Sequence, residues 1–257
     1  MSPGPDPGPI QREATDLSGH PQAIERFAGI LADWLASYMI AAPLGAEMAD
    51  AMEAGSAWVG AIGAGAARRV GWPDAESVAW GISVSALAAA HVAAIRSLDG
   101  ETQSRDPGSG ALGPACALLA ADGLIAAAHE TLASLSPERL AAAFAALERA
   151  YGDGGPWKLL PAEAATTGPG TAVWPRLVPV ALRPAAMENP DGPWADLAAA
   201  WERFGDAGSG GDGGDPEAAA ERALYQHSAA DRSTIALLRA AAEAARRPGR
   251  KGSRDRG

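Results

Sequence analysis

The sequence predicts an all-α protein, and three observations support this prediction. Alanine, the strongest helix former, makes up about a quarter of the 257 residues. Apolar residues recur at helical spacing in one segment after another, with no strand-like alternation between residues 21 and 246. Aromatic residues are only 5% of the chain, so the core has to consist mainly of Ala, Leu, Val and Ile, which lets helices pack closely.

Residues 1–20 contain four prolines and three glycines and are expected to form a disordered leader. A single helical domain is expected over residues 21–246, followed by a basic disordered tail at 247–257. Within the domain the periodic pattern predicts helices at about 22–41, 45–70, 75–98, 112–133, 137–151, 171–186, 194–204, 216–227 and 231–246.

Turn residues mark where these helices meet. Gly71-Trp72-Pro73-Asp74 combines a helix stop with a new start, and Ser136-Pro137 places a capping residue before a proline at the first helical position. Gly152–Pro156 and two acidic, glycine-rich segments, 99–110 and 205–215, are expected to be loops.

Charge and composition exclude several classes of protein. The formal net charge is −10, the wrong sign for binding nucleic-acid phosphates. Cys116 is the single cysteine, so no intrachain disulfide can form. The N-terminus lacks the features of a signal peptide, which predicts a cytoplasmic protein. Three apolar stretches, 27–46, 81–98 and 111–128, are interrupted by charged residues, histidine or proline and are expected to be core helices rather than membrane spans.

The segment 118–133, Leu-Leu-Ala-Ala-Asp-Gly-Leu-Ile-Ala-Ala-Ala-His-Glu-Thr-Leu-Ala, resembles a helix of the trans-isoprenyl diphosphate synthases, the polyprenyl synthetase family. Upstream, Ala66–Gly71, Asp74–Glu76 and Ala88–Ile95 resemble, in order, the two helices that precede the family's first aspartate-rich motif. Downstream, Leu197–Asp206 resembles the helix that leads to the second motif. The resemblance extends over about residues 22–227.

This resemblance implies a bundle of about nine to ten helices around a central cavity. In the family, two DDxxD motifs hold Mg²⁺ on an allylic diphosphate, and a basic segment holds isopentenyl diphosphate. Mg²⁺ suits this role because it binds carboxylates together with phosphate oxygens.

The chain departs from the family at these motifs. The first motif falls on Leu98–Thr102, leaving Asp99 with Glu101 nearby, and the second falls on Gly205–Ser209, leaving Asp206 with Asp212 displaced along the loop. The basic segment falls on Ala54–Gly60, which has no cation. The resemblance thus implies the metal candidates Asp99, Glu101, Asp206 and Asp212, and a cavity lined by His91, Ile95, Leu98, Leu119 and Asp122. Asp99 and Asp206 are expected to lie within roughly 15 Å of each other.

Three functional hypotheses remain open. The first is a non-catalytic or regulatory partner subunit, a pseudoenzyme of isoprenoid metabolism that needs no cofactor, forms a homodimer or a heterodimer with an active isoprenyl diphosphate synthase, and could bind an isoprenoid ligand. The second is a diverged Mg²⁺-dependent prenyltransferase or terpene cyclase acting on allylic diphosphates. The third is an unrelated alanine-rich bundle whose similarity is compositional.

Overall fold

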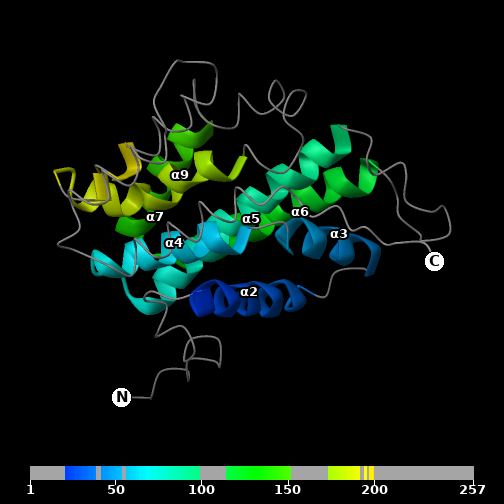
Figure 1. Cartoon of the computed structure of the whole chain (residues 1–257), viewed down its shortest axis with the longest axis horizontal. Coiled ribbons are helices and arrows are strands. Elements are labelled where there is room, and N and C mark those ends of the chain that lie inside the picture. The colour runs from blue at the N-terminus through cyan, green and yellow to red at the C-terminus, as the bar shows by residue number, and fades with distance from the viewer. Residues whose placement is uncertain are drawn as a thin grey trace.

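All regular structure in the described residues is helical, as the sequence predicts. The structure, a computed structural model, describes residues 21–38, 42–53, 56–98, 114–151, 173–191, 194–195 and 197–199. The helices are α2 (Pro21–Ala36), α3 (Ala42–Glu53), α4 (Ser56–Arg69), α5 (Asp74–Leu98), α6 (Pro114–Leu132), α7 (Pro137–Tyr151) and α9 (Val173–Glu188) (Figure 1). The expected leader and tail, and the helices expected at 216–227 and 231–246, lie outside the described residues.

Helix α5 forms the centre of the bundle, with α4, α6, α3 and α9 packed around it (Figure 1). Residues 77–90 are buried without interruption, and they are apolar or small on every face, which is the pattern of a helix enclosed by protein. By length and composition, the windows Asp74–Ala94 and Ala115–Leu132 could each cross a membrane. The first is 89% buried inside the protein, as expected of a core helix, and the second is only 44% buried.

Two glycines allow α4 and α5 to approach each other closely. A Cβ atom added at Gly60 would collide with Ser85 and Phe27 and would lie 2.5 Å from the carbonyl oxygen of Gly81. A Cβ atom at Gly81 would lie 2.5 Å from the carbonyl oxygen of Gly60 and 2.9 Å from the Cβ of Ala64. Real Cβ contacts are longer than this, so the crossing requires glycine on both helices.

The turn between α4 and α5 forms as the sequence predicts. Gly71 has φ of 90°, a conformation that favours glycine. The N–H of Trp72 donates to the carbonyl of Ala67 at 3.1 Å, and the N–H of Gly71 donates to the carbonyl of Arg68 at 3.1 Å. These two bonds satisfy the last carbonyls of α4, and Arg68 then forms an ion pair with Asp74 at the start of α5.

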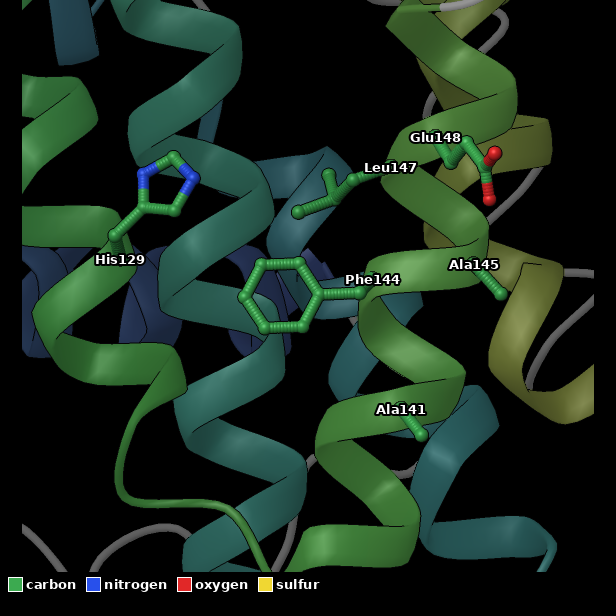
Figure 2. A pocket seen from close by; sticks show the side chains of 6 residues that line it. All are labelled: His129, Ala141, Phe144, Ala145, Leu147 and Glu148. Carbon is green, nitrogen blue, oxygen red and sulfur yellow. The ribbon is translucent and has the colours of Figure 1, made fainter.

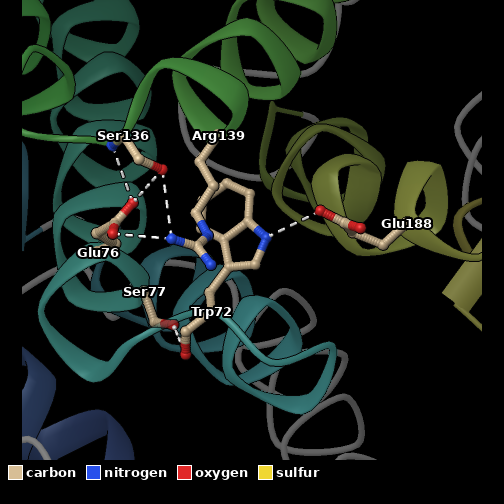
Figure 3. A network of polar contacts seen from close by, with 6 residues as sticks. All are labelled: Trp72, Glu76, Ser77, Ser136, Arg139 and Glu188. Carbon is tan, nitrogen blue, oxygen red and sulfur yellow. Dashed lines mark hydrogen bonds and ion pairs between the residues drawn. The ribbon is translucent and has the colours of Figure 1, made fainter.

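A polar network around Glu76 fixes the start of α7 against α5 (Figure 3). The Glu76 carboxylate accepts hydrogen bonds from the Ser136 N–H at 3.0 Å, the Ser136 hydroxyl at 3.1 Å and the Arg139 guanidinium at 2.9 Å. The Ser136 carbonyl accepts from the N–H of Leu140, which confirms Ser136 as the capping residue of α7. Arg139 also lies over the Trp72 ring, 5.8 Å from its centroid, and the Trp72 indole donates to Glu188, the last residue of α9, at 3.4 Å.

One expected helix boundary was wrong. The helix expected over 22–41 ends at Ala36, where the Ser37 hydroxyl and N–H donate to carbonyls of the last turn. Of the helix expected over 45–70, the structure describes α3 as far as Glu53 and α4 from Ser56, and residues 54–55 lie outside the described residues.

Candidate functional site

The positions expected to bind metal lie outside the described residues. Helix α5 ends at Leu98, as the resemblance implies, but the structure does not describe Asp99, Glu101, Asp206 or Asp212. Among the residues that it does describe, no three His, Cys, Asp or Glu side chains are grouped so that they could hold a metal ion. The expected proximity of Asp99 and Asp206 therefore stays a prediction.

His91 lies partly buried on α5, two turns before the end of the helix. Burial disfavours the imidazolium and lowers the pKa of His91 to about 3. The ring is therefore neutral at physiological pH, and the low pKa makes it a weak base. The side chains of Ile95 and Leu98, the other two α5 residues expected along a cavity, are outside the description.

The resemblance aligns the family's basic diphosphate-binding segment with Ala54–Gly60, and the described residues of this segment belong to the protein core. Ser56 and Val59 are fully buried at the start of α4, and Trp58 is 4% exposed. The Ser56 carbonyl accepts a hydrogen bond from the Ser85 hydroxyl at 3.0 Å, and the Ser56 hydroxyl donates to the Met52 carbonyl at 2.7 Å. These residues pack against α5 and contain no cation that could meet a phosphate.

Leu119 and Asp122 do not lie where a closed cavity would need them. Both are exposed on α6, with Leu119 54% exposed. The side of α6 that faces α5 instead carries buried residues such as Ala120, Leu124 and Ala128. In the described part of the chain, Leu119 and Asp122 thus belong to the surface of the bundle.

The exposed side of α6 carries large apolar side chains and approaches α7 where the His129 ring lies beside the Phe144 ring; we call this surface the outer face. Its large apolar members are 36–54% exposed: Leu118, Leu119 and Ile125 on α6, and Phe144 on α7. The polar residues Asp122 and His129 lie among them on α6. Residues 118, 122, 125 and 129 follow one another at helical spacing, so they form one stripe along α6.

An open groove lies at one end of the outer face, between α6 and α7 (Figure 2). Its volume is about 450 Å³, and its lining residues are His129, Ala141, Phe144, Ala145, Leu147 and Glu148. The Phe144 and Leu147 side chains extend from α7 toward α6, and the Phe144 and His129 ring centroids are 6.4 Å apart. The His129 Nδ1 lies 2.7 Å from the carbonyl oxygen of Ile125, so the ring orientation is fixed within its own helix.

The outer face suits contact with another apolar surface. Exposed apolar area grouped in this way, bordered by polar side chains, is typical of surfaces that bind a partner. Sequence reasoning identified Leu119 and Asp122 but assigned them to a cavity, and it missed Leu118, Ile125 and Phe144. The spacing of Leu118, Asp122 and Ile125 could have indicated a separate face of α6, because it places them on one side of the helix.

The helices and their packing define an all-α protein with an isoprenoid-synthase-like fold. The chain is similar to the crystal structure of the geranyl diphosphate synthase small subunit from Antirrhinum majus, with a TM-score of 0.54 and 19% sequence identity. The similarity covers 86% of this chain and 98% of that one. No protein-family model matches the sequence, and no curated protein matches it.

Proposed function

We propose that this protein is a non-catalytic or regulatory partner subunit in isoprenoid metabolism. The observation that carries the proposal is the burial of Ser56, Trp58 and Val59 at the position where the resemblance places the cations that hold isopentenyl diphosphate. A diphosphate there would have to displace core side chains, and it would find no positive charge to offset its own. A protein that retains the fold but lacks this diphosphate-binding segment is suited to binding another protein.

Two further observations support the proposal. The solved protein with the similar fold is named as a small subunit of geranyl diphosphate synthase. The outer face supplies an exposed apolar surface through which a subunit could associate with its partner.

The purified chain alone is expected not to condense isopentenyl diphosphate with dimethylallyl, geranyl or farnesyl diphosphate in the presence of Mg²⁺. The missing cations at Ser56, Ala57 and Val59 are the physical reason. A product assay with radiolabelled isopentenyl diphosphate checks this, with an active isoprenyl diphosphate synthase as the positive control. Turnover of order 1 s⁻¹ or faster would instead support the diverged prenyltransferase that uses Asp99, Glu101, Asp206 and Asp212.

A further inference from the structure

We draw no further inference here: the strongest candidate, the open groove between α6 and α7, belongs to the outer face already described, and nothing in the described part of the chain shows what covers it.

Discussion

Gly60→Ala is expected to lower the free energy of unfolding by roughly 3 kcal/mol or more, the upper range for an overpacked core. The new methyl group would collide with Ser85 and Phe27 and would lie 2.5 Å from the carbonyl oxygen of Gly81. Backbone atoms of α5 cannot move aside as a flexible side chain can, so the α4–α5 crossing has to open. Urea denaturation followed by circular dichroism measures the change.

Gly65→Ala is the matched control on the same helix. No atom lies within 4 Å of a Cβ placed at Gly65, so alanine should stabilise the protein by about 0.5–1 kcal/mol through its helix propensity. If the two variants have equal stability, the close approach of α4 and α5 at Gly60 is not part of the native structure.

Glu76→Ala is expected to lower the free energy of unfolding by about 2 to 3 kcal/mol, because the Ser136 N–H, the Ser136 hydroxyl and the Arg139 guanidinium all lose the carboxylate that accepts their hydrogen bonds. These donors lie 2.9–3.1 Å from the carboxylate. The start of α7 should also loosen, which hydrogen exchange at its first turn would detect. Glu138→Ala removes an exposed carboxylate from the same turn of α7 and should change stability by less than about 0.5 kcal/mol.

The same network makes stability depend on pH. Burial alone would raise the pKa of Glu76, but the hydrogen bonds from Ser136 and the charge of Arg139 outweigh burial and lower it. The pKa of Glu76 is therefore lower in the folded state than in the unfolded state, where it is about 4.5. The network stabilises the folded protein fully at pH values above 4.5, and this stabilisation is lost as the pH falls through the folded pKa. Glu76→Gln should therefore lose less stability on acidification than the wild type. Equal losses would contradict the role given to the carboxylate.

Local signals in the sequence predicted much of the fold. Gly71 and Ser136-Pro137 specify backbone geometry and capping through their own chemistry, and the structure confirms both turns. The long apolar pattern of residues 75–98 correctly predicted a core helix, α5.

The spacing of Leu118, Asp122 and Ile125 puts them on one side of α6, but the sequence does not decide whether that side faces the core or the solvent. Alanine contributes little apolar area, so the alanine-rich α6 shows no dominant apolar side. Tertiary packing decides which side of α6 is buried: Met48 of α3 lies close to Gly123, and Leu124 is fully buried in the core. For the same reason Asp122 was assigned to a cavity, although it lies on the outer face.

The proposed role of this chain is to act on isoprenoid synthesis through another subunit. The most direct measurement compares an active isoprenyl diphosphate synthase from the same organism with and without an equimolar amount of this chain, recording the rate and the distribution of product chain lengths. We expect this chain alone to form no product and its addition to shift the synthase's rate or product distribution. Product formed by the chain alone, or a synthase that is unchanged in both rate and products when the chain is added, would contradict the proposed role.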